Sequence, residues 1–446
     1  MATWFTHYRI ANILADKHQT LDRNAFILGN LAPDSGLLIS DLVYNPSSNI
    51  SHYTTNSDKA KIMVNQLLSD YLFKVKNLKE YSFLMGYYIH LITDKIYSNL
   101  VFKELIESNH ITDLKGKELA HARKEWHQAD ALIYNDLKNE IIKDLNSLDF
   151  SASIVEHFSD EHYHDMIKRR IDEMNHVPNV DYLYTTALDN TNFIKTCIDQ
   201  LDDILVSWIK PIKTYDTLFI DLDNTIFDFE KAEDRSLRNT FNKFGVDASR
   251  ENMDIYIRIN KELWHQLEEN LITKDELFWK RFELALEAMG ESYKDPKAMA
   301  NEYAHQLSMS MDYFEGVEET LFALKKEYQI DLITNGILSI QTPRIQNSSL
   351  KDCLDHIFIS EQMGYSKPNI EYFKTALNLA EVKDKSKVLV VGDALSSDIK
   401  GASNAKLDCV WITNMINTTK LKHELIIDNL SILRLWLKRP NYFSNN

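Results

Sequence analysis

The stretch TLFIDLDNTIFDFE (217–230) runs from apolar residues onto two aspartates, Asp221 and Asp223, with a single residue between them. Burying or crowding two carboxylates has a high free-energy cost, so packing alone does not account for the pair. The apolar run predicts a buried strand, and the acids at its end predict a chemical site.

Two later apolar runs also end on polar residues, and a lysine precedes a predicted helix. Thr334 ends the run IDLIT, Asp393 and Asp398 follow KVLVVG, and Lys367 lies in YSKPNIEYF. The carboxyl ends of parallel strands meet at one edge of a sheet, where such folds bind ligands. We therefore expect these side chains to lie together around Asp221.

These residue types fit phosphoryl transfer. A carboxylate can attack phosphorus and form an aspartyl-phosphate, which divides hydrolysis into two displacements. A second acid two residues on can protonate the leaving oxygen and then activate water. A hydroxyl and an ammonium group can hold the phosphoryl oxygens, and the remaining carboxylates are the hard oxygen ligands that Mg²⁺ prefers.

The sequence pattern changes near residue 210. Before it, the pattern predicts long helices and no convincing strand; after it, short β-rich runs alternate with helical segments, which is typical of a parallel α/β sheet. Pro211 in WIKPIKTYD (208–216) interrupts a helix at the predicted boundary. We expect a multidomain chain, with an all-α domain over 1–210 and an α/β, Rossmann-like domain over 214–446.

The composition excludes several classes of protein. A net charge of −16 offers no basic surface for a nucleic-acid polymer, and a small anionic substrate would need a metal ion or local cations. The longest apolar stretch, YSFLMGYYIHLITD, is too short and too polar for a transmembrane segment, and no secretory signal opens the chain. Three widely spaced cysteines suit a reducing compartment, so we expect a cytoplasmic protein.

The order DLDNT, ITNG, SKPN, GDALSSD resembles the four motifs of haloacid dehalogenase-like phosphatases, over residues 214–438. The resemblance implies a Mg²⁺-dependent phosphomonoesterase in which Asp221 is the nucleophile and Asp223 the general acid and base. It implies that Thr334 and Lys367 bind the phosphate. It also implies metal ligands and substrate-binding residues in the same motifs: Asp221, the backbone of Asp223, Asp393 and Asp398 for Mg²⁺, and Thr225, Asn335 and Gly336 for the substrate.

Residues 228–315, between the first two motifs, have helical periodicity, and Thr273 with Glu276 forms a capping-box pattern at one helix start. In the resembled family, an insertion here is a helical cap that closes over the active site and sets specificity. YIRINKELWHQLEENLITKDELFWKRF, with TNGILSIQTPRIQ and FISEQMGYSKPN, resembles the pyrimidine-nucleotide 5′-nucleotidases that clear non-canonical nucleoside monophosphates. Trp264, Phe278 and Trp279 are candidates to stack a base, although aromatic residues at helical spacing also form cores.

Eleven of the 15 histidines lie in residues 1–176. The segments THYRIA (6–11), LGNLAPDSG (28–36), SHY (51–53) and FLMGYYIHLITD (83–94) resemble, more weakly, the metal-site segments of bacterial zinc-dependent phospholipases C, over residues 3–175. His90 and Asp94, spaced i,i+4, can bind one metal ion from a single helix face. The resemblance implies Zn²⁺ ligands from these segments and from a later helix: His7, Asp34, His52, His90 and Asp94, with either His127 and Asp130 or His121 and Glu125.

The sequence departs from this second pattern after Asp94, where KIYSNLVF lacks an expected histidine. Alternatives for both halves therefore stay open. The second half hydrolyses a nucleoside 5′-monophosphate or another small phosphorylated metabolite, such as a sugar phosphate. The first half is a zinc phosphodiesterase or phospholipase, or a non-catalytic binding module.

Overall fold

The computed structural model describes residues 2–40, 43–54, 63–107, 117–177, 180, 181, 183, 190–268, 271–413 and 422–443. The chain divides into two compact units: the first comprises residues up to 212 and from 435 onward, and the second most of the chain between them. All three cysteines are buried, and no disulfide joins any two of them. None of the helices described is long and apolar enough to cross a membrane.

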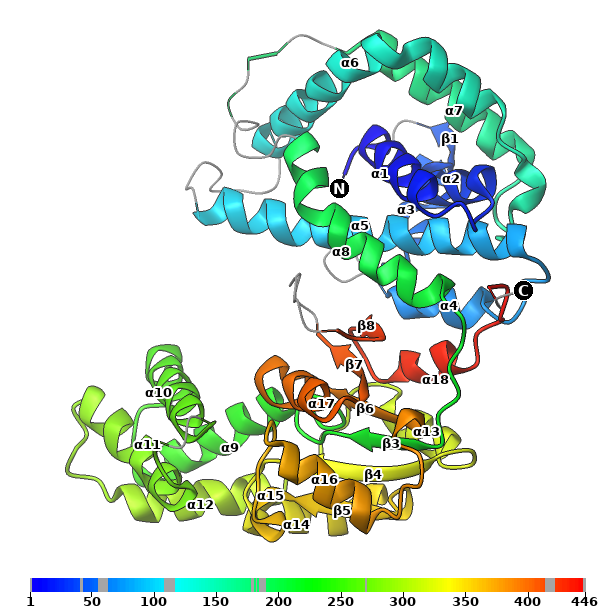
Figure 1. The fold of residues 1–446 in the computed structure, drawn as a ribbon. Helices are drawn as coiled ribbons and strands as arrows, with labels where there is room; N and C mark the ends of the chain where they lie inside the picture. The colour runs from blue at the N-terminus through cyan, green and yellow to red at the C-terminus, as the bar shows by residue number, and fades with distance from the viewer. Residues whose placement is uncertain are drawn as a thin grey trace. The chain divides into compact units, whose positions relative to one another are not determined.

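The first unit is a bundle of helices (Figure 1). Its described helices, two of them 3₁₀, are α1 (Trp4–Lys17), α2 (Arg23–Leu31), η1 (Ala32–Asp34), α3 (Ser48–Ser51), α4 (Val64–Tyr71), α5 (Leu78–Glu107), α6 (Lys117–Asn146), η3 (Phe150–Ala152), α7 (Asp160–Asn175) and α8 (Asn190–Ile209). Helix α1 packs against α2, α5 and α8, and its Phe5 ring meets Tyr134 of α6 edge to face. Helix α1 is therefore buried at the centre of this unit.

Two glycines allow α2 and α5 to pack with their backbones in contact. A Cβ atom at Gly29 would lie 1.9 Å from the carbonyl oxygen of Phe83, and one at Gly86 would lie 2.0 Å from that of Phe26. No side chain fits at such distances, because they are far below a van der Waals contact. This close packing fixes α5, which carries His90, relative to the segment after α2.

The first unit also contains two short strands, contrary to the expectation of none. Strands β1 (Leu37–Ser40) and β2 (Val43–Asn45) form an antiparallel hairpin. The pattern LLIS lacks the apolar–polar alternation of a half-buried strand, and most of the hairpin is in fact exposed. The periodicity of the sequence therefore could not predict these two strands.

The end of the chain belongs to the first unit, whereas we expected the second domain to run to residue 446. The buried indole of Trp436 donates to the carbonyl oxygen of Ser207 at 2.8 Å, and Tyr442 stacks at a tilt on Tyr81 with ring centroids 5.5 Å apart. A buried indole N–H needs an acceptor, which α8 supplies. These contacts join residues more than 200 positions apart, so local sequence patterns do not report them.

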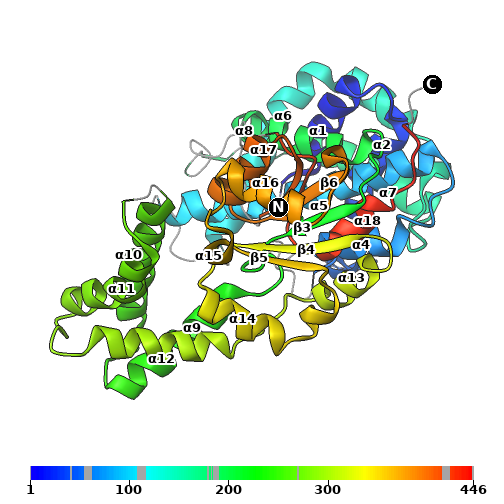
Figure 2. The same ribbon diagram turned by 60° about the horizontal axis from the view of Figure 1, so that its bottom comes forward.

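The second unit is built on a six-stranded sheet whose strands are all parallel (Figure 2). In spatial order the strands are β5 (His356–Ile359), β4 (Gln329–Thr334), β3 (Thr217–Ile220), β6 (Val388–Gly392), β7 (Asp408–Ile412) and β8 (Leu425–Ile427). Because β3 is central and its Ile220 pairs with Leu332 of β4 and Val391 of β6, the carboxyl ends of these three strands lie side by side.

Helices follow the strands, as the alternating pattern predicts. They are α13 (Val317–Leu324), α14 (Leu338–Gln346), α15 (Ser360–Met363), α16 (Ile370–Leu379), α17 (Lys400–Ala405) and α18 (Ser431–Leu437). Phe373 of α16 and Ala402 of α17 pack with Phe219 and Val390 in one apolar cluster on the sheet. Burial of this apolar surface holds the sheet and its loops in place.

Four helices between β3 and β4 form a separate group, the cap, to one side of the sheet (Figure 2). They are α9 (Phe229–Phe244), α10 (Arg250–Glu268), α11 (Lys274–Ala288) and α12 (Pro296–Ser308). The capping box at Thr273 and Glu276 is present as predicted, with both reciprocal hydrogen bonds formed. The cap has its own core, which includes Phe241, Tyr256 and Phe282.

Candidate functional site

The carboxylate of Asp221 lies directly after β3 and is almost fully buried. Lys367, which precedes α16, donates from Nζ to Oδ1 of Asp221 and to Oδ1 of Asp398, each at 2.6 Å, and to the carbonyl oxygen of Ile333 at 3.1 Å. One ammonium group therefore links the ends of β3, β4 and the loop after β6. The expectation that strand ends bring these residues together is met.

Negative charge exceeds positive charge at this edge of the sheet. Carboxylate oxygens of Asp221, Asp393 and Asp398 all lie within 4.8 Å of one another. Burial, reinforced by Asp398, raises the pKa of Asp393 to about 7, and burial with the neighbouring acids raises that of Asp221 despite Lys367. Three carboxylates against one ammonium group fit a divalent cation with oxygen ligands, such as Mg²⁺.

Thr334, the last residue of β4, follows Ile333, whose carbonyl oxygen accepts a hydrogen bond from Lys367. Its Oγ1 accepts hydrogen bonds from the backbone N–H of Gly336 at 3.0 Å and from Nε2 of Gln341 at 3.2 Å. Since both contacts use the oxygen as acceptor, the hydroxyl proton is left to donate to a phosphoryl oxygen. Thr225, two residues after Asp223, is buried, and its Oγ1 has no hydrogen-bond partner.

The side chain of Asn335, one of the residues expected to bind substrate, makes two hydrogen bonds to the backbone of Lys367. Its Nδ2 donates to the carbonyl oxygen of Lys367 at 2.8 Å, and its Oδ1 accepts from the backbone N–H of Lys367 at 2.9 Å. The amide is thus occupied in holding the lysine loop against the loop after β4.

Asp223 is not among the three aspartates whose carboxylate oxygens lie within 4.8 Å of one another, and its carboxylate has partners of its own. Its Oδ1 accepts from Nη1 of Arg344 at 2.5 Å, and its Oδ2 accepts from Nε2 of Gln341 at 2.6 Å. Both partners lie on α14, and sequence reasoning missed them. The available signal was their position in TNGILSIQTPRIQ, one and two helical turns into the helix that follows Thr334.

The sequence also did not single out Lys274, at the start of cap helix α11. Its Nζ donates to the carbonyl oxygen of Asn335 at 2.7 Å and to Oγ of Ser360 at 2.8 Å, and it lies 3.4 Å from Glu361. Burial lowers the pKa of Lys274 against the opposing effect of Glu361. This lysine therefore ties the cap to the loop that follows β4.

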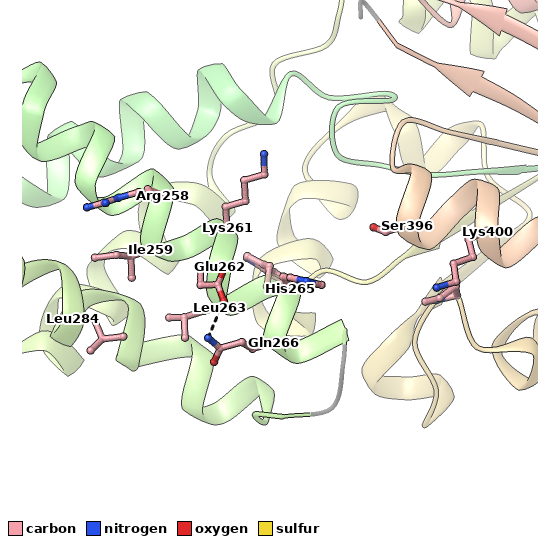
Figure 3. Close-up of a pocket in the computed structure, with 12 residues that line it drawn as sticks. Arg258, Ile259, Lys261, Glu262, Leu263, His265, Gln266, Leu284, Ser396 and Lys400 are labelled. Carbon is pink, nitrogen blue, oxygen red and sulfur yellow. Dashed lines mark hydrogen bonds between the residues drawn. The ribbon is translucent and has the colours of Figure 1, made fainter. Parts of the chain in front are cut away.

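A cavity of about 1080 Å³ lies between cap helix α10 and the helical segment after β6 that carries Ser396 and Lys400 (Figure 3). From α10, Trp264 and His265 line it, and from the core Ser396 and Lys400 do. Phe278 and Trp279, the other candidates for base stacking, pack instead against the core of the cap. Of the three aromatic residues, Trp264 alone is therefore placed to meet a ligand in this cavity.

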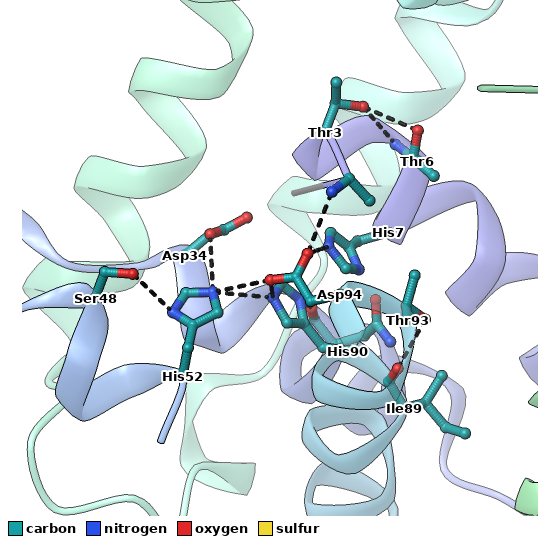
Figure 4. Close-up of polar contacts among 12 residues, drawn as sticks. Thr3, Thr6, His7, Asp34, Ser48, His52, Ile89, His90, Thr93 and Asp94 are labelled. Carbon is teal, nitrogen blue, oxygen red and sulfur yellow. Dashed lines mark hydrogen bonds and ion pairs between the residues drawn. The ribbon is translucent and has the colours of Figure 1, made fainter. Parts of the chain in front are cut away.

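The first unit gathers five buried histidine and aspartate side chains from separate segments (Figure 4). Nε2 of His90 lies 3.2 Å from Nε2 of His52, which lies 3.6 Å from Oδ2 of Asp94 and 3.5 Å from Oδ1 of Asp34. Nε2 of His7 lies 3.4 Å from Oδ1 of Asp94. We call these five residues the His–Asp cluster.

Neighbouring groups orient the two central imidazoles. Nδ1 of His90 donates to the carbonyl oxygen of Asn30 at 2.7 Å, and Nδ1 of His52 lies 2.9 Å from Oγ of Ser51, so both Nε2 atoms face the cluster. Burial, with His7 nearby, lowers the pKa of His90 well below its usual value. Nδ1 of the buried His7 has no hydrogen-bond partner, and its Nε2 has only the longer contact with Asp94. Imidazole nitrogens and carboxylate oxygens that face one another in this way fit a metal ion such as Zn²⁺.

Neither later pair of expected ligands joins this cluster in the part of the chain that the structure describes. Asp130 accepts a hydrogen bond from the hydroxyl group of Thr3, and His127 lies on the same helix outside the cluster. In the alternative pair, Nε2 of His121 lies 3.1 Å from Oε1 of Glu125. Sequence spacing did not reveal this, because helix α6 turns these side chains toward other partners.

Comparison with known proteins agrees with this division. Residues 218–412 match the family model of haloacid dehalogenase-like hydrolases, and residues 5–208 match that of zinc dependent phospholipase C. The pyrimidine 5′-nucleotidase PynA of Streptococcus pneumoniae is 34% identical over 44% of this chain and 83% of its own length. The pyrimidine 5′-nucleotidase YjjG of Escherichia coli is 32% identical over 44% of this chain and 86% of its own length. A glyceraldehyde 3-phosphate phosphatase of Pyrococcus furiosus is 30% identical over 44% of this chain and 79% of its own length.

The parallel sheet, the carboxylate and lysine group at its edge and the inserted cap define a hydrolase of the phosphatase class. This chain belongs to the haloacid dehalogenase-like hydrolases, and it resembles the pyrimidine 5′-nucleotidases among them. Its first unit resembles zinc-dependent phospholipase C.

Proposed function

We propose that the second unit is a Mg²⁺-dependent phosphomonoesterase that acts on pyrimidine nucleoside 5′-monophosphates, non-canonical ones included. The observation that carries this proposal is the position of Lys367, 2.6 Å from both Asp221 and Asp398 at the carboxyl edge of the sheet. A nucleophilic carboxylate, a cation for phosphoryl oxygens and a group of acids for Mg²⁺ thus lie together.

In the first displacement, a carboxylate oxygen of Asp221 attacks phosphorus and the bond to the ester oxygen breaks. Asp223 gives its proton to that leaving oxygen, because an alkoxide is a poor leaving group without one. Lys367 and the hydroxyl group of Thr334 hold the phosphoryl oxygens as their charge changes.

In the second displacement, water attacks the aspartyl-phosphate, Asp223 takes the proton of that water, and phosphate leaves Asp221. Asp221, Asp393, Asp398 and the backbone of Asp223 would hold Mg²⁺, which supplies charge neutralisation between these acids and the phosphate dianion. The cap excludes bulk water during both steps.

The substrate class rests on two supports. The names of two relatives at 34% and 32% identity specify pyrimidine 5′-nucleotidases. The cavity beside the site has Trp264 on one wall, and an aromatic ring can stack on a base. The alternative, another small metabolite such as a sugar phosphate, is supported by the relative named as a glyceraldehyde 3-phosphate phosphatase.

A screen of the full chain against nucleoside monophosphates and sugar phosphates, with Mg²⁺ and with EDTA, tests this function. We expect phosphate release to be fastest from pyrimidine nucleoside 5′-monophosphates and to stop with EDTA. Faster release from a sugar phosphate would favour the alternative. No release from any ester would contradict the proposal.

For the first unit we propose a Zn²⁺ site made of the His–Asp cluster. The supports are the Nε2 atoms of His52 and His90, which face each other at 3.2 Å, and the ligand-type atoms of His7 and the two aspartates close to them. Bound zinc would supply a Lewis acid for phosphodiester hydrolysis. Release of a water-soluble phosphoester from phosphatidylcholine vesicles by the zinc-loaded chain would support a phospholipase, whereas bound zinc without hydrolysis would support a binding module.

A further inference from the structure

Two side chains of α14 hold both oxygens of Asp223. Arg344 donates from Nη1 to Oδ1 at 2.5 Å, and Gln341 donates from Nε2 to Oδ2 at 2.6 Å. Rotation of the Asp223 side chain would break both hydrogen bonds, one of which is an ion pair. The orientation of this carboxylate is therefore set by α14.

Arg344 and Gln341 are themselves fixed. Nη1 of Arg344 also donates to Oε1 of Gln341 at 2.8 Å, and its Nε donates to the carbonyl oxygen of Ser310 at 2.9 Å. The guanidinium group lies 5.0 Å from the centre of the Phe227 ring, and both polar side chains are buried. Because the amide oxygen of Gln341 accepts from Arg344, its NH₂ group must face Asp223.

Gly336 provides the space for this amide. A Cβ atom at position 336 would lie 2.0 Å from Nε2 of Gln341. The same Nε2 atom also donates to Oγ1 of Thr334 at 3.2 Å. Gln341 therefore connects the carboxylate of Asp223 to the hydroxyl group that we assign to phosphate binding.

We propose that Gln341 and Arg344 are positioning residues that orient Asp223 for proton transfer in both displacements. The inference rests on the proposed phosphomonoesterase function. As the bond between phosphorus and the leaving oxygen breaks, the proton moves from Asp223 to that oxygen; as water attacks, a proton returns to Asp223. Both transfers need the carboxylate within hydrogen-bond reach of the moving proton.

The test measures kcat and KM of full-length Gln341→Leu and Arg344→Met on two esters. A pyrimidine nucleoside 5′-monophosphate has a poor alkoxide leaving group, whereas 4-nitrophenyl phosphate needs no proton. We expect kcat on the nucleotide to fall about 10- to 100-fold, since a positioned general acid contributes about 10²- to 10⁴-fold. We expect a smaller loss of kcat/KM on the aryl ester, because kcat/KM reports the first displacement, in which that ester needs no proton.

The control is Gln346→Leu, at an exposed position on the same helix, which should leave the hydrolysis rate of both esters unchanged. A double-mutant cycle adds a readout that a structural role would not move. In an Asp223→Ala background, Gln341→Leu should cause no further loss on the nucleotide, because its effect acts through the missing carboxylate.

Equal losses of kcat/KM on both esters, or a loss that adds to that of Asp223→Ala, would overturn the inference and leave the phosphomonoesterase function intact. A wild-type chain inactive on both esters would overturn the proposed function and the inference with it. If thermal melting shows that Arg344→Met does not fold, the inference is judged on Gln341→Leu alone, because that substitution removes no buried charge.

Discussion

Nζ of Lys367 lies 2.6 Å from Oδ1 of Asp221, with both side chains buried at the end of the central strand. Burial alone would lower the pKa of Lys367, but Asp221 and Asp398 outweigh it and raise that pKa, so the lysine stays charged. The proposed nucleophile is therefore paired with the Lys367 ammonium group, which can instead bind the phosphoryl oxygens when substrate is present.

Asp221→Asn should retain the fold and lose all turnover of phosphomonoesters. The side chains are nearly isosteric, but an amide cannot form the aspartyl-phosphate. Phosphate release by the purified variant, with circular dichroism as a check of folding, measures this. Appreciable hydrolysis by a folded variant would refute the assignment of Asp221.

Lys367→Met should destabilise the second unit by about 3 to 5 kcal/mol, because removing one partner leaves buried carboxylates unpaired. The measurement is the shift of the unfolding transition that responds to Mg²⁺. Added Mg²⁺ should recover part of the loss, since a cation can replace the ammonium charge. Lys387→Met, which removes an exposed pair with Asp216, is the control and should have a small effect.

Lys274→Met should lower kcat/KM about 10-fold, mainly through a higher KM, because hydrogen bonds from a charged donor contribute about 1.5 to 3 kcal/mol each. The tie between the cap and the loop after β4 is lost in this variant. Lys243→Met is the matched control, since Lys243 pairs with Glu302 inside the cap. If the two variants behave alike, the tie has no part in turnover.

His90→Ala should abolish zinc binding by the first unit and leave phosphatase activity unchanged. Elemental analysis of the full chain after zinc loading and desalting gives the metal content, and thermal melting with and without chelator gives its contribution to stability. His176→Ala, at an exposed position outside the cluster, is the control and should keep the metal. If the wild-type chain holds no zinc and its melting temperature does not change with chelator, these histidines are structural residues.

Local patterns of sequence determined which elements form and where the main polar residues stand in them. The runs before Asp221, Thr334 and Asp393 are strands, and the parallel topology alone places their ends together. The cap and its capping box at Thr273 likewise follow from periodicity and helix-end chemistry.

Only the tertiary structure decided the partners of these residues. It assigned Arg344 and Gln341 to Asp223 and Lys274 to the carbonyl of Asn335. It also separated His127 from the His–Asp cluster and returned the chain end to the first unit. The physical reason is that periodicity encodes which face of an element is buried, whereas the side chain met across that face depends on how distant segments pack.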